Sequence, residues 1–138
     1  LYALFRIKMK KIFTNGCFDI LHRAHIELFK YCKSMGHLIV GLNSDESIRR
    51  LKGTKRPINT EKDRKYILES IRCIDEVVIF DEDTPYELIK CVKPDIIVKG
   101  GDYTAAAVIG SDLAEIKIFK YIDGYSTTKI IERTRSGR

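Results

Sequence analysis

Residues 14–25 read Thr14-Asn15-Gly16-Cys17-Phe18-Asp19-Ile20-Leu21-His22-Arg23-Ala24-His25. The segment leaves an expected strand, turns at Gly16 and enters a helix whose first turn carries His22 and His25. A helix that begins there offers free backbone N–H groups and the positive end of its dipole to an anion. Because residues three positions apart share a helix face, both imidazoles can be directed at one phosphate. The segment therefore predicts a strand–turn–helix unit that binds a phosphate-bearing ligand.

Short apolar runs alternate with helical periodicity along the rest of the chain. The expected strands are residues 11–15, 38–42, 77–80, 96–99 and 115–119. Helices are expected at residues 22–35, 45–51, 60–74, 84–92 and 127–133. The expected N-caps of the last three are Thr60, Thr84 and Ser126, and Pro85 is expected at the first position of the fourth. This alternation predicts an α/β fold, a Rossmann-like single domain with a five-stranded parallel sheet flanked by helices on both faces. Ligands of such sheets bind at the carboxyl ends of the strands.

The length of 138 residues is typical of one domain. Residues 1–9 are expected to be an N-terminal extension, residues 10–133 the functional domain and residues 134–138 a basic C-terminal tail. The formal net charge of +6 comes from residues 1–11 and 132–138, so residues 12–131 are formally neutral. The domain between the tails is neutral and carries no nucleic-acid motif. The basic tails alone therefore do not favour a nucleic-acid-binding function.

The chain has no apolar run near the roughly 18 residues that span a bilayer, so we expect no membrane insertion. Its four cysteines, Cys17, Cys32, Cys73 and Cys91, form no C-x-x-C pair. Such spacing favours buried, reduced thiols and a cytoplasmic protein. His37 is the only other histidine, and no H-E-x-x-H pattern is present, so no metal site is predicted on the histidines.

Two motifs together resemble a known enzyme family. Residues 14–25 resemble the T-x-G-x-F-D-x-x-H-x-G-H signature of nucleotidyltransferases, and Ser126-Thr127-Thr128 resembles their I-S-T-T motif. The resemblance covers about residues 10–133. The family includes the glycerol-3-phosphate, choline-phosphate and ethanolamine-phosphate cytidylyltransferases.

Within this family the chain is most similar to the adenylyltransferase domains of ADP-heptose synthases. The similar segments are residues 43–45, 50–53, 56–57, 81–85, 99–103 and 123–128. The glycerol-phosphate branch carries Arg-Thr-Glu-Gly before its Ser-Thr-Thr, whereas residues 121–124 here are Tyr-Ile-Asp-Gly. The missing Arg favours the adenylyl branch.

The resemblance implies transfer of AMP from ATP to a sugar 1-phosphate, D-glycero-β-D-manno-heptose 1-phosphate, with release of pyrophosphate. ATP is then a co-substrate, and Mg²⁺ is carried by its phosphates and by water, without an assigned protein ligand. The family also implies a homodimer. The alternatives are a cytidylyltransferase for glycerol 3-phosphate or another polyol phosphate, and a nucleotide-binding module without catalysis.

The resemblance also implies roles for individual residues. Five basic side chains are expected to act in catalysis: His22, His25, Lys52, Arg56 and Arg64. Nucleotide binding is expected at Thr14, Asn15, Gly16, Cys17, Phe18, Gly100, Asp102, Ser126, Thr127 and Thr128, and acceptor binding at Asp19 and Asn43. Four alternatives stay open: Lys52 and Arg56 belong to a solvated loop, Arg64 pairs with Glu61 or Glu69 on its own helix, and Asp19 caps the first helix. The fourth is that Gly100 and Gly101 form a simple turn and do not let the nucleotide approach the backbone closely.

Ala24 departs from the family pattern, which has glycine between the two histidines. Alanine favours a helix by about 1 kcal/mol over glycine. Its methyl group is nevertheless expected to crowd the nucleotide, and a positive φ at this position would strain it. We therefore expect ATP binding with reduced affinity or turnover, and a higher kcat/KM in Ala24→Gly.

Overall fold

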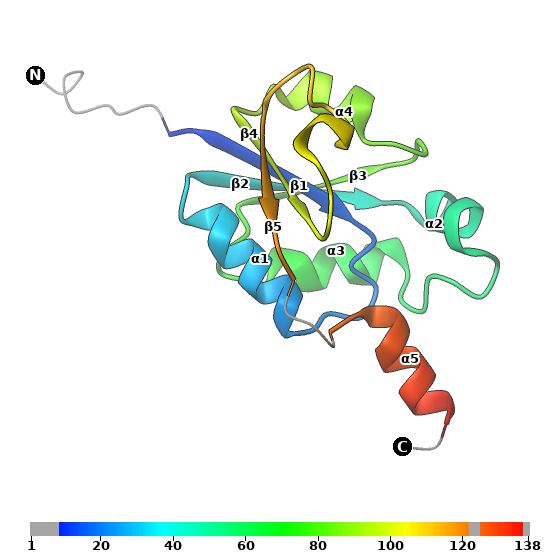
Figure 1. Ribbon diagram of the computed structural model, residues 1–138. Coiled ribbons are helices and arrows are strands. Elements are labelled where there is room, and N and C mark those ends of the chain that lie inside the picture. Colours follow the sequence, from blue (N-terminus) through cyan, green and yellow to red (C-terminus); the bar gives the residue numbers. More distant parts are fainter. Residues whose placement is uncertain (1–8, 122–124, 137–138) are drawn as a thin grey trace, which may run out of the picture.

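The computed structural model describes residues 9–121 and 125–136. Five parallel strands form one sheet in the order β3-β2-β1-β4-β5 (Figure 1). They are β1 (Lys11–Gly16), β2 (His37–Asn43), β3 (Glu76–Phe80), β4 (Ile96–Gly100) and β5 (Glu115–Phe119). The prediction of a single α/β domain with a five-stranded parallel sheet is confirmed.

The helical segments are α1 (Arg23–Lys33), α2 (Asp45–Lys52), α3 (Glu61–Glu69), α4 (Tyr86–Val92), the 3₁₀ turn η2 (Ala105–Ala107) and α5 (Thr127–Arg135). The expected N-cap Thr84 is wrong by one residue, because Pro85 is the residue before the first helical residue of α4. Helix α5 continues through Arg135, into the segment expected as a basic tail. Residues 1–8 of the expected N-terminal extension and residues 137–138 lie outside the described residues.

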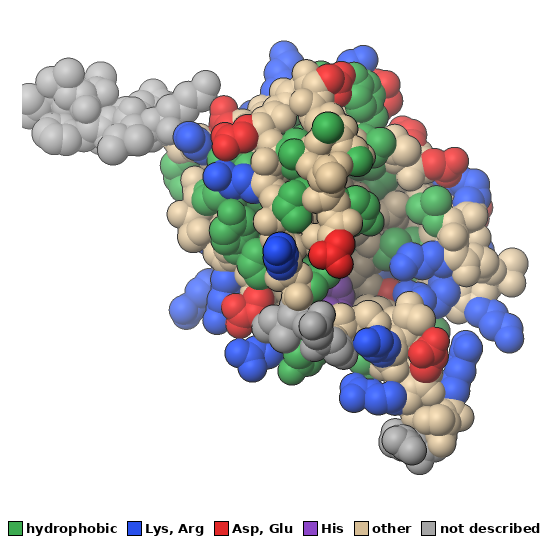
Figure 2. Space-filling view, viewed as in Figure 1, with side chains coloured by type: hydrophobic (Ala, Val, Ile, Leu, Met, Phe, Trp, Pro, Cys, Tyr) green, Lys and Arg blue, Asp and Glu red, His purple; other side chains and the backbone are tan. Residues whose placement is uncertain are grey.

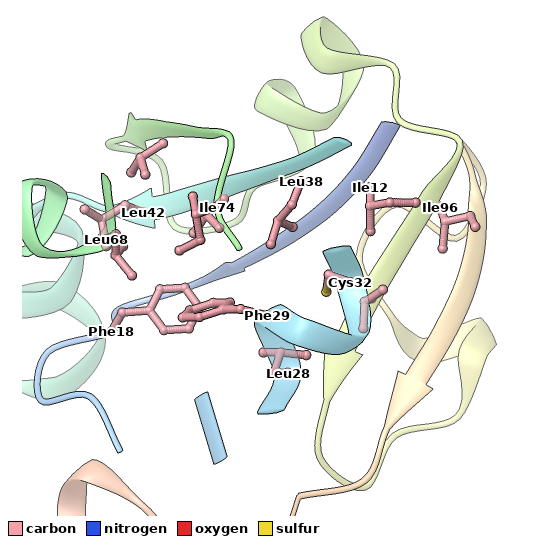
Figure 3. Close-up of a cluster of buried hydrophobic side chains, with 13 residues drawn as sticks. Ile12, Phe18, Leu28, Phe29, Cys32, Leu38, Leu42, Leu68, Ile74 and Ile96 are labelled. Carbon is pink, nitrogen blue, oxygen red and sulfur yellow. The ribbon is translucent and has the colours of Figure 1, made fainter. Parts of the chain in front are cut away.

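Helices cover both faces of the sheet, with α1 and α3 on one side and α4 on the other (Figure 1). The strands supply side chains to the two faces alternately, as the pleat requires: Ile12 packs on the α1 side and Phe13 on the α4 side. On the α1 side, Phe18 and Phe29 meet edge to face with ring centroids 5.1 Å apart (Figure 3). Burial on both faces explains why β2 is apolar at nearly every position.

The order in which successive strands are added to the sheet reverses between β1 and β4. β1 pairs with β2 at six positions, from Lys11 to Gly16, but with β4 only at Ile12 and Phe13. Beyond Phe13 the Thr14 hydroxyl donates a hydrogen bond to the Val98 carbonyl, at 2.9 Å. The two halves of the sheet therefore separate toward their carboxyl ends, which is where α/β sheets bind ligands.

Among the described residues, no helix is long and apolar enough to cross a membrane. The four cysteines are free. Cys32 is buried and Cys17 and Cys73 are partly buried, but Cys91 on α4 is exposed. The expectation that all four thiols are buried is therefore wrong for Cys91.

Candidate active site

A cavity of about 490 Å³ opens at the carboxyl ends of the central strands. Asn15 and Gly16 reach its wall from β1, Asn43 from β2 and Lys99 from β4. Figure 2 shows a histidine surface set back in a hollow of this face, with Lys and Arg side chains along one side of the hollow. Most of the expected site residues line this cavity: Asn15, Gly16, Cys17, Phe18, Asp19, His22, His25, Asn43, Lys52, Arg56, Ser126, Thr127 and Thr128.

The two histidines stack at the start of α1. Their ring centroids are 3.8 Å apart and the ring planes differ by 22°. His22 is the N-cap residue, and its backbone N–H donates a hydrogen bond to Nδ1 of His25, at 3.2 Å. Since Nδ1 of His25 accepts this bond, the ring proton of the neutral imidazole lies on Nε2. The main chain therefore fixes His25 as a hydrogen-bond donor through Nε2.

Both imidazoles are neutral near pH 7. Burial, with a smaller contribution from His22, lowers the pKa of His25 to about 4. Burial also lowers the pKa of His22. Nδ1 of His22 is buried and faces the backbone N–H of His25 in a capping-box arrangement, but it makes no hydrogen bond of good geometry within the described part of the chain. A buried polar atom of this kind is satisfied when a ligand or a water supplies the missing partner.

A second helix N-terminus faces the same cavity. Ser126 is the N-cap of α5, and its Oγ accepts a hydrogen bond from the backbone N–H of Lys129, at 3.0 Å. The Thr127 hydroxyl donates to the carbonyl of Ile20, at 2.7 Å, which holds the start of α5 beside the segment that leads into α1. Two helix dipoles therefore present their positive ends to one cavity, an arrangement that favours anions.

Asp19 holds the loop between α2 and α3. It is 3% exposed, and its carboxylate accepts hydrogen bonds from Nε of Arg56 and from the backbone N–H groups of Ile58 and Asn59, at 2.8–3.0 Å. It does not cap α1, whose N-cap is His22. The ion pair uses only Nε of Arg56, and no described residue accepts a hydrogen bond from its two terminal nitrogens. Asp19 therefore places a guanidinium with available donors on the cavity wall.

Arg64 lies beneath the cavity and does not line it. Its side chain is fully buried and donates to the carbonyls of Cys17, Asn43 and Asn59 and to the Asp45 carboxylate, at 2.8–2.9 Å. The expected partners Glu61 and Glu69 are not used. One guanidinium therefore joins the ends of β1 and β2 to α2 and α3, and four of its five N–H donors are used by protein acceptors.

Three other expected residues also lie off the cavity wall. The Thr14 hydroxyl bonds to Val98, and Asp102 is exposed beyond β4. At Gly100, a Cβ would stand 2.4 Å from the Tyr121 ring, so the glycine makes room for this tyrosine. The sequence suggested that Gly100 lets the nucleotide approach the backbone, but in the structure an aromatic side chain occupies that space.

The turn after β1 depends on a close contact between two of its own residues. Phe18 has a positive φ of 45°, which costs a non-glycine residue about 1 kcal/mol or more. This conformation packs its ring into the core and against His25, with centroids 5.3 Å apart. A Cβ at Gly16 would lie 3.0 Å from the Phe18 ring. Glycine at position 16 therefore leaves room for this ring, and its own φ is not in the positive region.

Ala24 is fully buried in the first turn of α1 and does not line the cavity. Among the described residues, the only non-glycines with positive φ are Phe18 and Lys93. Ala24 is thus unstrained, and the expected crowding of the nucleotide by its methyl group has no support in the cavity wall.

Eight wall residues were not selected from the sequence: Leu51, Asp83, Thr84, Pro85, Lys99, Ile109, Tyr121 and Tyr125. Asp83, Thr84, Pro85 and Lys99 lie in segments that carry the family resemblance, and each follows a strand or ends one, which could have identified them. Leu51 and Tyr125 also lie in such segments, whereas the positions of Ile109 and Tyr121 depend on tertiary contacts that no local pattern encodes.

The cavity favours an anionic ligand. Lys52, Arg56 and Lys99 are its cations, and the carboxylates on its wall are already paired, Asp19 with Arg56 and Asp83 with Arg50. Burial raises the pKa of the Cys17 thiol against the opposing effect of nearby Lys52, Arg64 and Arg56. Cys17 is thus a protonated thiol near pH 7, and the site is suited to charge stabilisation without a cysteine nucleophile.

Comparison with known proteins gives a family and a set of relatives. The family model described as cytidylyltransferase-like matches residues 13–133. A protein of Nitratiruptor sp. named bifunctional protein HldE is 58% identical over 127 residues, which is 91% of this chain and 28% of that protein. The protein of the same name from Helicobacter pylori strain J99 is 54% identical over 98% of this chain and 30% of that protein. The chain thus spans less than a third of these relatives.

Solved structures share the fold. The lipopolysaccharide core biosynthesis protein of Thermoplasma volcanium has a TM-score of 0.70 and 29% identity, over 86% of this chain and all of that one. The pantothenate synthetase of Thermus thermophilus has a TM-score of 0.63 at 16% identity, over 93% of this chain and 64% of that one, and shows only the shared fold.

Proposed function

This chain belongs to the cytidylyltransferase-like family and is a nucleotidyltransferase, and from that premise we propose that it transfers AMP from ATP to D-glycero-β-D-manno-heptose 1-phosphate and releases pyrophosphate. The choice of acceptor is supported by the identity to the HldE proteins and by the segments that resemble ADP-heptose synthases. The similarity to a lipopolysaccharide core biosynthesis protein agrees with it. We propose in addition that the protein acts in the cytoplasm as a homodimer.

The observation that carries the proposal is the stacked pair of neutral imidazoles at the cavity, on a helix N-terminus opposite a second helix N-terminus. An oxygen of the acceptor phosphate attacks the α-phosphorus of ATP, and the bond from that phosphorus to the bridging oxygen of pyrophosphate breaks. The acceptor phosphate is already an anion near pH 7, so no side chain has to remove a proton. Catalysis is then alignment together with stabilisation of the charge on the phosphoryl oxygens.

The histidines are suited to this as uncharged donors. His25 offers Nε2–H, because its Nδ1 is occupied by the backbone of His22. His22 has a buried nitrogen that still needs a partner. Donors that are held in place before the reaction stabilise developing charge without the cost of reorientation. We assign both rings to the oxygens of the α-phosphate.

The remaining cationic and N–H groups divide between the other phosphates. The N-terminus of α5, at Ser126, Thr127 and Thr128, is assigned to the β- and γ-phosphates. Lys52 and Arg56 are assigned to the acceptor phosphate, with the forked guanidinium suited to two oxygens at once. Asn43 is assigned to the acceptor. Thr14, Asp19 and Arg64 position these groups.

The donor set fits a Mg²⁺ ion that arrives with ATP as MgATP. No group of three or more His, Cys, Asp or Glu side chains comes together as a metal site among the described residues. The carboxylates of Asp19 and Asp83 on the cavity wall are engaged by arginines. Phosphate oxygens and water would supply most ligands of such an ion, and its charge would offset that of the pyrophosphate leaving group.

Pyrophosphate release with ATP or CTP, measured against a panel of sugar and polyol phosphates, tests the proposal. We expect release with ATP and the heptose 1-phosphate. Release with CTP alone, or with glycerol 3-phosphate in preference to the sugar, would replace our assignment by the cytidylyltransferase alternative. Nucleotide binding without release for any acceptor would indicate a module without catalysis.

A histidine series tests the observation on which the proposal depends. His25→Asn and His22→Asn should each lower kcat/KM by about 10²-fold or more, because each removes a donor to the transferred phosphoryl group. His37→Asn is the matched control, since His37 lies at the amino end of β2, away from the cavity at the carboxyl ends, and bonds Glu76 at 2.6 Å. Equal activity in all three variants would refute the assignment.

A further inference from the structure

Lys99 is a cation on the cavity wall to which no motif gives a role. It is half-buried at the end of β4, and its Nζ lies 5.0 Å from the centroid of the Tyr103 ring. Within residues 9–121 and 125–136, no carboxylate forms an ion pair with it. An aromatic face attracts an ammonium group but, unlike a carboxylate, does not neutralise its positive charge. The ammonium of Lys99 is therefore held in place and is still able to bind an anion.

A recess of about 120 Å³ opens beside the main cavity, and Lys99 lines both. Asn15, Pro85, Lys99 and Ile109 line both the recess and the main cavity, and Tyr103 lines the recess. Lys99 thus stands between the main cavity and a largely apolar recess.

The sheet order indicates which substrate meets Lys99. β2 and β4 lie on opposite sides of β1, so the cavity has cations on two sides: Lys52 and Arg56 follow β2, and Lys99 ends β4. Two anionic substrates that react head to head over β1 need one such side each. Tyr121, which follows β5 on the way to helix α5 and its assigned site for the outer phosphates, packs against Gly100, the residue next to Lys99. The β4 side is therefore the side of the nucleotide.

We propose that Lys99 is a further catalytic residue that binds a phosphate oxygen of the nucleotide, with Tyr103 as a positioning residue that holds its ammonium. The inference rests on the proposed function, in which a nucleoside triphosphate and a phosphomonoester meet in this cavity. Lys99 is then the third cation of the site, after Lys52 and Arg56, and its substrate is the nucleotide. Tyr103 acts only through Lys99.

Two measurements on the full chain test the role of Lys99: the Kd of a non-hydrolysable ATP analogue by calorimetry, and the KM of each substrate. Lys99→Met should raise the Kd and the KM for ATP about tenfold or more, as expected for a lost hydrogen bond to a charged group, and leave the acceptor KM unchanged. Lys99→Arg should recover part of the loss. Lys90→Met is the matched control, because Lys90 also lies over a tyrosine ring, that of Tyr86 at 5.8 Å, but outside the cavity.

A double-mutant cycle tests the role of Tyr103. Tyr103→Phe keeps the aromatic face and should bind the analogue like the unmodified protein, whereas Tyr103→Leu should weaken binding severalfold. In the Lys99→Met background, Tyr103→Leu should have no further effect. An additive effect of the two changes would refute the positioning role.

The inference and the proposed function fail in different ways. Wild-type affinity in Lys99→Met, or a rise in the acceptor KM instead of the ATP KM, would overturn the inference while the unmodified protein still binds nucleotide and releases pyrophosphate. Failure of the unmodified protein itself to bind any nucleotide would overturn the proposed function.

Discussion

Thr127 and Ile20 are 107 residues apart in sequence, yet the hydroxyl of the first donates a hydrogen bond to the carbonyl of the second at 2.7 Å. This bond joins the start of the last helix to the segment between β1 and α1. The anion-binding ends of α1 and α5 can therefore act on one ligand. The site depends on a tertiary contact as well as on the two motifs that it connects.

Removal of this bond should weaken nucleotide binding without unfolding the protein. We expect Thr127→Val to raise the KM for ATP about three- to tenfold, since one neutral hydrogen bond contributes about 0.5–1.5 kcal/mol. Thr134→Val is the control, because Thr134 lies on the same helix and donates to the Ile131 carbonyl away from the cavity. Similar KM values for the two variants would show that the tether is not needed for binding.

The free energy of unfolding should depend on pH through the buried imidazole of His25. Its folded-state pKa of about 4 lies below the unfolded value of 6.5, so the unfolded chain binds more protons between these pH values. The free energy of unfolding should fall as the pH decreases from about 6.5 to 4, by a contribution on the order of 3 kcal/mol. Denaturant titrations between pH 7 and pH 4.5 should show a smaller loss in His25→Asn than in the unmodified protein. Parallel pH profiles would exclude a depressed pKa.

Arg64 should matter first for stability. Its guanidinium is fully buried and its removal leaves Asp45 and three carbonyls without their donor. Arg64→Met should lower the free energy of unfolding by about 3–5 kcal/mol, measured by denaturant titration. The control is Arg72→Met, because Arg72 is exposed. A stable Arg64→Met protein with lost activity would instead place this arginine among the groups that contact substrate.

Ala24→Gly should lower the free energy of unfolding by roughly 0.5–1 kcal/mol, because glycine is unfavourable within a helix. Ala24 does not line the cavity, so we expect kcat/KM to stay within about twofold of the unmodified value. A marked rise in kcat/KM would support the hypothesis from the sequence that the Ala24 methyl group crowds the nucleotide, and would show that the nucleotide contacts the backbone here. Thermal unfolding and steady-state kinetics on the same preparations measure the change in stability and the change in kcat/KM separately.

The fold could be predicted because its signals are local and repeated. Strand β5 covers the residues expected from its apolar run, and the first strand differs by one residue. The N-caps Thr60 and Ser126 were also predictable, because each side chain bonds a nearby backbone N–H. Pro85 was placed one residue too far into α4, since its fixed φ suits both the N-cap and the first helical position.

The partners of the polar residues could not be predicted in this way. Asp19 and Arg64 were expected to act on substrate, but their hydrogen-bonding groups are used by loops and strand ends far away in sequence. Whether a charged side chain faces a ligand or the protein depends on which acceptors the fold brings within 3 Å, and that information is not in the local pattern. Tyr121, which occupies the space above Gly100, is a second example.

The short pairing between β1 and β4 has a mechanical consequence. Only two residue positions of β1 pair with β4, and a side-chain hydroxyl at Thr14 supports the next step, so the two halves of the sheet are joined by a narrow bridge. A nucleotide seated above this bridge would contact both halves and act as a brace between them. Saturation with nucleotide should then slow amide hydrogen exchange in β4 and β5 as well as in the residues that touch the ligand.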